Sequence, residues 1–345
     1  MKVKNIFGEG ELYEAQDVKG SMYVLCCACM SIYAEFLSWA NTTSGKNRLW
    51  PTFMKDPYSA DSMIVLSCQV TDLVVLNDIR TIENLMKEYP DKDFYVGGCL
   101  ARRFDIELPG GVKRLDIVKS DYTSIEDKYL VDFQRPFWIS KYKDVDDEFA
   151  DGHLFRNMYP LRISVGCKQK CTYCTVRTTR GDFYELDIGK FEKELLNHKD
   201  VLLIADSPLS EQLAEIIDLC LFIGKPISIR NVEPHVSLKI MPDIQKLTEK
   251  GLLKVFHSPI QSDNSAALKD MGRNPSTTLE LIRQTAKLRE YGVTTATNII
   301  IDYKDFLNPN MEELEKTYDY ISWNPYWDGK WDRKKAEARF TQYLE

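Results

Sequence analysis

The sequence predicts an α/β protein with two parallel sheets, a small N-terminal domain followed by an open, incomplete barrel of six β/α units. Short apolar runs alternate with longer amphipathic segments along the whole chain, and this alternation is typical of parallel sheets. An acidic segment at residues 141–151 interrupts the rhythm, which then restarts. We therefore expect a domain boundary there, with domains at residues 1–145 and 146–345.

The composition is that of an ordinary globular protein. Of the 345 residues, 44% are hydrophobic and 28% are charged, and no apolar run is long enough to span a membrane. The N-terminus lacks an apolar signal core, so we expect a cytoplasmic protein without membrane contact. The nine cysteines are then expected to be reduced thiols available to metal. The net charge of −7 gives no general attraction to nucleic acid.

In the N-terminal half, strands are expected at residues 22–27, 62–67 and 93–97, with helices at 31–40 and 72–88. Cys29, Cys68 and Cys99 each follow one of these strands. Ligands of open parallel sheets collect at the carboxyl ends of the strands, so these thiols could converge on one point. Cys26 and Cys27 are close alternatives to the first of them.

The second half continues with six strands and five helices. We expect strands near 160–165, 201–205, 226–230, 253–257, 295–301 and 319–323, and helices near 188–198, 209–222, 239–250, 276–291 and 311–318. Six units are too few for the closed eightfold barrel, so we expect an open one. In either form the chemistry belongs at the carboxyl ends of the strands.

Cys167, Cys171 and Cys174 follow the first barrel strand at C-x3-C-x2-C spacing. A [4Fe–4S] cluster normally takes four thiolates, so three in a tight loop leave one iron open to a small molecule. The alternatives are a zinc site or buried thiols. Zinc takes four N or S ligands, and no His or Cys follows at a usable local spacing. The spacing therefore favours a cluster.

Several further motifs resemble those of radical S-adenosylmethionine (SAM) enzymes of the methylthiotransferase family, and the resemblance extends over most of the chain. The motifs are Gly166-Cys-Lys-Gln-Lys-Cys-Thr-Tyr-Cys174 with Arg180-Gly181, Glu233-Pro234, Phe256-His-Ser-Pro-Ile-Gln-Ser262 with Met271-Gly-Arg273, Ala60-Asp61, Ser67-Cys68 and Gly98-Cys99. The family's Gly-Phe-Pro-Gly-Glu after the fifth barrel strand is missing, and Asn298-Ile-Ile-Ile-Asp-Tyr303 runs on into Lys304-Asp-Phe306 instead. The chain ends about where we would expect the family's RNA-binding TRAM domain to begin.

The resemblance implies a methylthiotransferase-type domain followed by a radical SAM partial barrel, with two [4Fe–4S] clusters. Cys167, Cys171 and Cys174 would hold the SAM cluster, and Cys29, Cys68 and Cys99 an auxiliary cluster. Cys29 is chosen because Glu35 and Ala40 then fall where the family has an acidic residue and an alanine. The residues implied in binding SAM or substrate are Tyr173, Asp206, Ser207, Glu233, Gln261 and Arg180. His257 is a further candidate, and each could instead be structural.

The implied activity is sulfur transfer, with a methylthio group inserted at an unactivated C–H bond. It requires SAM and an external low-potential electron donor of the flavodoxin or ferredoxin type, and we expect a monomer. The acidic charge and the RNA-binding domain that we do not find favour a protein or peptide substrate slightly over adenosine in tRNA. Two other hypotheses are a different radical SAM sulfur insertion and a non-enzymatic iron–sulfur electron-transfer protein.

Overall fold

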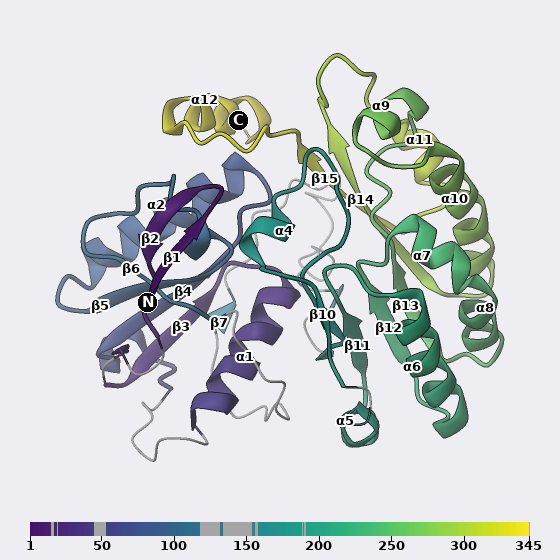
Figure 1. Cartoon of the computed structure of the whole chain (residues 1–345), viewed down its shortest axis with the longest axis horizontal. Helices are drawn as coiled ribbons and strands as arrows, with labels where there is room; N and C mark the ends of the chain where they lie inside the picture. The colour runs from purple at the N-terminus through teal and green to yellow at the C-terminus, as the bar shows by residue number, and fades with distance from the viewer. Residues whose placement is uncertain are drawn as a thin grey trace. The chain divides into compact units, whose positions relative to one another are not determined.

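The computed structural model describes residues 1–14, 17–18, 20–44, 53–117, 132–133, 154–155, 158–187, 189 and 191–344 (Figure 1). The chain divides into two compact units. Unit 1 comprises Met1–Phe137, Thr178–Arg180 and Gly329–Glu345, and unit 2 comprises Trp138–Arg177 and Gly181–Asp328. The boundary expected between residues 145 and 146 lies outside the described residues.

Unit 1 is built on a five-stranded parallel sheet in the order β6-β5-β4-β3-β7. Its strands are β3 (Met22–Cys26), β4 (Ser62–Ser67), β5 (Asp93–Gly98), β6 (Lys113–Arg114) and β7 (Asp132–Phe133). Its helices are α1 (Met30–Ser44), α2 (Asp72–Glu88) and α12 (Arg333–Leu344), with short 3-10 turns η2 (Pro57–Ser59) and η3 (Leu100–Arg102). A hairpin of β1 (Lys2–Asn5) and β2 (Gly8–Glu11) precedes the sheet.

The sheet of unit 1 forms where apolar runs are long enough to be buried on both faces. Every residue of β4 is buried, as parallel strands require. Helix α2 begins after Thr71, whose side chain accepts a hydrogen bond from the Val74 amide at 3.2 Å, an arrangement that stabilises helix starts. Strands β3, β4 and β5 end one to three residues before Cys29, Cys68 and Cys99, so each of these cysteines follows the carboxyl end of its strand.

Unit 2 is built on a six-stranded sheet in the order β15-β14-β13-β12-β11-β8, with every pair parallel. The strands are β8 (Tyr159–Arg162), β11 (Val201–Ile204), β12 (Ile227–Arg230), β13 (Leu253–His257), β14 (Thr294–Ile301) and β15 (Tyr320–Pro325). Short strands β9 (Ser164–Val165) and β10 (Tyr184–Glu185) pair beside it. The α/β class with parallel sheets is thus confirmed, and no closed barrel is formed by the described strands.

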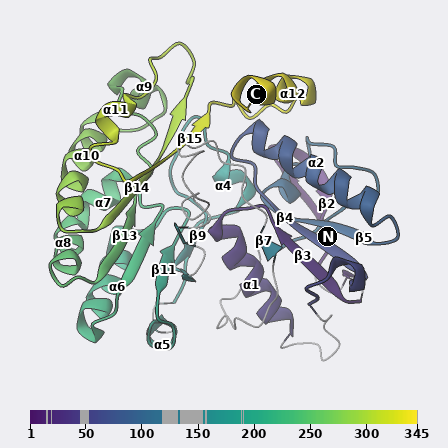
Figure 2. The same ribbon diagram turned by 180° about the vertical axis from the view of Figure 1, so that it is seen from behind.

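The helices of unit 2 follow the strands in alternation. They are α5 (Phe191–Asn197), α6 (Ser210–Ile223), α7 (Pro234–Lys239), α8 (Met241–Glu249), α9 (Ser265–Asp270), α10 (Pro275–Glu290) and α11 (Met311–Leu314). The short helix α4 (Val176–Thr179) is divided between the two units. Helices α6, α8 and α10 lie along one face of the sheet (Figure 2). Helix α8 corresponds to the helix predicted at 239–250, and the short helix α7, which the sequence does not predict, precedes it; each has a proline in its first turn. None of the described helices combines the length and apolarity that a membrane span needs.

Candidate functional site

The C-x3-C-x2-C loop of unit 2 leaves the sheet after β9 through Gly166. This glycine has φ +73°, and a Cβ there would lie 2.8 Å from the Asp182 carbonyl oxygen, so no other residue fits without strain. Its amide donates to Asp206 Oδ2 at 3.0 Å. Asp206, expected to bind SAM, therefore also holds the start of the loop.

The three thiols of the loop lie close enough to influence one another. Cys174 is exposed at the surface, yet the groups crowded around its sulfur desolvate it and raise its pKa, and the neighbouring Cys171 and Cys167 raise it further. Burial also raises the pKa of Cys167 to about 11, with Glu233 adding to the effect. The Gln169 amide donates to Cys167 Sγ at 3.3 Å. Backbone amides of this kind stabilise a thiolate, the form that binds metal.

This donor set fits an iron–sulfur cube better than a single ion. Among the described residues, no group of three His, Cys, Asp or Glu is placed to hold one metal ion. In a cube, each thiolate binds a different iron, so the sulfurs need not meet at one point. Three thiols in one loop, with a carboxyl group beside Cys167, suit a cluster that has one iron open to another ligand.

Glu233 and Arg273 place opposite charges beside the loop. Glu233 is 6% exposed, and burial raises its pKa to about 7. Cys167 Sγ lies 3.9 Å from its Oε1, and Oε2 is buried without a hydrogen-bond partner. Arg273 Nε donates to the Tyr173 hydroxyl at 3.1 Å, and Nη1 to the Pro259 carbonyl at 2.9 Å. The Arg273 charge in turn lowers the pKa of Glu233.

A cavity of about 210 Å³ opens between these groups. Its lining includes Cys171, Glu233, His235, Arg273 and Thr277. A carboxyl group and a guanidinium in one cavity can bind the ammonium and the carboxylate of an amino acid. Arg273 was part of a recognised motif in the sequence but was not singled out there as a site residue. Its position beside the loop follows only from contacts with residues distant in the sequence, such as Tyr173.

The remaining candidates of unit 2 differ in their placement. Ser207 is 3% exposed and lies close to Cys167 and Glu233, where its hydroxyl offsets part of the rise that burial causes in the pKa of each. Tyr173 packs on the group formed by Met271, Ile300 and Tyr303. Gln261 has a left-handed backbone, φ 69°, and extends the sheet through hydrogen bonds with Asn298 and Ile300. The structure thus brings Cys167, Tyr173, Asp206, Ser207 and Glu233 together around the loop.

Unit 1 carries the second cysteine set at the ends of its three central strands. Burial raises the pKa of Cys68, and the neighbouring Cys29 and Cys99 add to the effect, so the three thiols are near one another. The Cys68 amide donates to the buried Asp78 Oδ2 at 2.9 Å. Cys26 instead points into the strand region, where its Sγ donates to the Ala28 carbonyl at 3.6 Å. A second three-thiolate cluster on Cys29, Cys68 and Cys99 stays a prediction.

Arg180 has a buried ion-pair partner within its own unit. It lies in unit 1, where its Nη1 donates to Glu35 Oε2. Arg180 is 3% exposed and Glu35 is fully buried. The preceding Thr179 accepts a 2.9 Å hydrogen bond from Gln69 Nε2, next to Cys68, and Arg103 donates to Gln69 Oε1 at 3.1 Å. Thr178–Arg180 is therefore anchored beside the auxiliary cysteines.

Comparison with known proteins agrees with this arrangement. The radical SAM superfamily profile matches residues 161–321, the segment that holds the C-x3-C-x2-C loop and most of the six-stranded sheet. Over a larger part of its length, the chain is similar to radical SAM methylthiotransferases. Its curated relatives include the ribosomal protein uS12 methylthiotransferase RimO of Clostridium botulinum, 26% identical over 290 residues, covering 76% of this chain and 64% of the relative.

The same name is carried by a relative in Fervidobacterium nodosum, 24% identical over 327 residues, covering 87% of this chain and 72% of the relative. Measured against the Clostridium protein, the chain spans about 64% of the relative's length. Among solved structures, the radical SAM methyltransferase TsrM of Kitasatospora setae aligns with 83% of this chain and 68% of its own, at 11% identity and a TM-score of 0.49. A likeness at that level adds nothing to the assignment.

Proposed function

We propose that this radical SAM enzyme is a methylthiotransferase that inserts sulfur at an unactivated C–H bond of a protein or peptide in the cytoplasm. The observation that supports it most is the occurrence of two three-cysteine sets, one in each unit: the first in the loop that follows β8 and β9, and the second at the carboxyl ends of the parallel strands β3, β4 and β5. One open cluster suffices to bind SAM, so a second set implies a second reactant. The uS12 methylthiotransferases named above support sulfur transfer to protein.

The proposed cofactors are SAM and two [4Fe–4S] clusters, held by Cys167, Cys171 and Cys174 and by Cys29, Cys68 and Cys99. When bound and reduced by an external donor, the first cluster and SAM supply a 5′-deoxyadenosyl radical, and the second cluster supplies sulfur. The protein binds and orients the reactants and excludes water. In this proposal Glu233 and Arg273 hold the amino-acid end of SAM, since both line the cavity beside Cys171.

The test begins with iron. The reconstituted chain should hold about eight irons, and the Cys167→Ala/Cys171→Ala/Cys174→Ala variant about four, because each set holds one cube. The triple variant should lose reductive cleavage of SAM. The Cys29→Ala/Cys68→Ala/Cys99→Ala variant should keep that cleavage but form no sulfur product. Full iron in either variant would contradict the ligand assignment.

The substrate is tested in cells that produce the wild type or the auxiliary triple variant. Proteins and tRNA from both are searched by mass spectrometry for a methylthio group that only the wild type adds. We expect it on protein. A methylthio group found on tRNA alone contradicts the protein preference. Iron at both sites with no sulfur product on either class would mean that the second cluster serves another reaction.

A further inference from the structure

The last strands of unit 2 carry polar side chains on the face opposite the helices. Ile299 of β14 packs with Leu314 of α11, so this residue faces the helical side. Side chains alternate along a strand, and Asn298 and Ile300 therefore lie on the other face. Ile300 packs in the group that includes Tyr173 of the cysteine loop. Asn298, two residues earlier and partly exposed, lies on the same face as the candidate site.

His257, at the end of β13, is held in one tautomer by its neighbours. The Asn231 backbone amide donates to its Nδ1 at 3.2 Å, so Nδ1 carries no proton. The ring proton is then on Nε2, which lies 3.0 Å from Asn298 Oδ1. Asn231 reaches this position with a left-handed backbone, φ 63°, a conformation that asparagine tolerates better than most residues. Both ring nitrogens of His257 are thereby occupied, and the side chain is 1% exposed.

This tautomer fixes the orientation of the Asn298 carboxamide. The two ends of an asparagine amide differ in chemistry, one accepting and one donating hydrogen bonds. Because Nε2–H of His257 is a donor, it requires the oxygen of Asn298. The Nδ2 group and its two N–H donors must then point away from His257. Exchanging the two ends would set two donors against each other.

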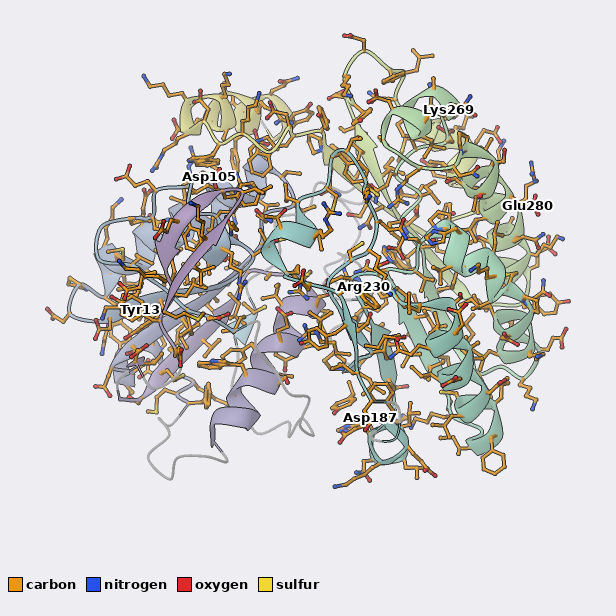
Figure 3. The ribbon with its side chains drawn as sticks, viewed as in Figure 1. Tyr13, Asp105, Asp187, Arg230, Lys269 and Glu280 are labelled. Carbon is orange, nitrogen blue, oxygen red and sulfur yellow. The ribbon has the colours of Figure 1, made fainter. Side chains whose placement is uncertain are left out.

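Other groups on this face favour an oxygen ligand. Ser322 of β15 pairs with Asn298 in register, which places both on one face, and its Oγ is buried without a hydrogen-bond partner. Arg230, labelled in Figure 3, is 4% exposed, and its guanidinium lies 5.2 Å from the centre of the Phe155 ring. The His257 ring packs edge-on against the same Phe155 at 6.3 Å. Donor side chains on the adjacent strands β14 and β15, with a buried cation on β12 of the same sheet, suit a carbonyl or carboxylate oxygen.

We propose that His257 is a positioning residue that turns Asn298, and that Asn298 Nδ2 donates to a carbonyl or carboxylate oxygen of the molecule bound on this face. That oxygen belongs to SAM or to the substrate, and the inference rests on the proposed function for the identity of both. His257 transfers no proton in this role, since Nδ1 accepts from a backbone amide and the Nε2 proton is held by Asn298. A role in proton transfer would require one of these bonds to break.

The tautomer is tested directly by ¹⁵N NMR of the ring nitrogens in the full chain. The protein has four histidines, so the His257 signals are assigned by their loss in His257→Gln. We expect a protonated Nε2 and an unprotonated Nδ1 at neutral pH. A proton on Nδ1, or on both nitrogens, overturns the proposal. This measurement does not depend on any activity of the enzyme.

Substitutions separate positioning from proton transfer. In His257→Gln, the side-chain oxygen can accept from Asn231 and the amide can donate to Asn298, so cleavage of SAM and sulfur insertion should stay within about threefold of wild type. His257→Phe keeps the ring shape but no longer orients the Asn298 carboxamide. The rate of the step that uses Asn298 should then fall about tenfold or more, the cost of a misplaced hydrogen bond. Equal losses in both variants contradict positioning.

Asn298→Asp identifies the source of the oxygen. The carboxylate still accepts from His257 but has no donor for a ligand. If the oxygen is that of SAM, the affinity of the reconstituted enzyme for SAM falls about 10- to 100-fold. If it is that of the substrate, SAM affinity stays unchanged, and the methylthio yield in cellular protein falls by a similar factor. The matched control is Asn310→Asp, at the start of α11, where Asp caps equally well. If Asn298→Asp leaves both the SAM affinity and the methylthio yield unchanged, the proposal is overturned. A wild type that forms no sulfur product counts against the proposed function alone.

Discussion

Breaking the ion pair of Arg180 and Glu35 should strongly destabilise unit 1. Both side chains are almost completely buried. Removing one partner leaves a buried charge without its counterion, which typically costs about 3–5 kcal/mol. For a unit of this size, each kcal/mol corresponds to roughly 2–4 °C in Tm. We therefore expect Arg180→Met and Glu35→Gln each to lower the Tm of unit 1 by roughly 6–20 °C.

The double variant Glu35→Leu/Arg180→Met should recover most of this loss, because an apolar pair of similar volume can replace a buried ion pair at little cost. The assay is thermal unfolding followed by circular dichroism, with hydrogen exchange of β3 and β4 to assign the transition to unit 1. The matched control is Arg283→Met. It breaks the exposed pair with Glu280, whose side chains are 68% and 38% exposed, and should cost under about 1 kcal/mol. A single variant as stable as the control, or a double variant whose loss equals the sum of the singles, would refute the reasoning.

Three further predictions concern other parts of the chain. Cys29→Ala should abolish sulfur insertion but keep SAM cleavage, because Cys29 and Cys99 are the thiols that influence the pKa of Cys68. Cys26→Ala should behave nearly as wild type, because the Cys26 thiol donates to the Ala28 carbonyl. Activity lost only in Cys26→Ala would identify Cys26 as the ligand in place of Cys29. Hydrogen bonds from Arg333 lower the pKa of Glu83 below its ordinary value of 4.5. The contribution of this pair to the stability of α12 is therefore present above pH 4.5 and is lost as the pH falls through the lowered pKa. Proteolysis of α12 should accelerate in that acid range in wild type and show no such step in Glu83→Gln. Gly166→Ala should cost about 1–3 kcal/mol of stability and reduce iron binding, since its Cβ meets the Asp182 backbone. The control Gly181→Ala, with φ +80° but no atom within 4 Å of the added Cβ, should keep its iron. Equal iron in both variants would contradict the steric argument.

The sequence predicts those features that depend on neighbouring residues. Apolar runs identify β4 and β11 because these strands are buried on both faces. Cysteine spacing identifies the loop at 167–174 because its three thiols lie close together in the sequence. Sequential parallel strands pair from β3 to β6 and from β11 to β15, as the β/α alternation favours, whereas β7 pairs with β3, which no local pattern indicates.

Contacts made across the sequence could not be predicted in this way. Glu233 is 66 residues from Cys167, and Arg180 is 145 residues from Glu35, so no local pattern connects them. The C-terminal segment is rich in both charges and lacks a broad apolar stripe, which gives no sign that α12 packs on α2. That packing depends on specific ion pairs, Arg339 with Asp72 and Arg333 with Glu83.

The position of α12 in unit 1 has a consequence for biosynthesis. Arg333 and its partner Glu83 are separated by 250 residues, so the N-terminal unit is translated long before the helix that completes it. At about 5–20 residues per second, the interval is roughly 12–50 s. During that time the first turn of α2, with Asp72 next to the loop of Cys68, is on the ribosome-bound chain without Arg339. Unit 1 thus begins to form first and is completed last, after the whole of the radical SAM domain has been made.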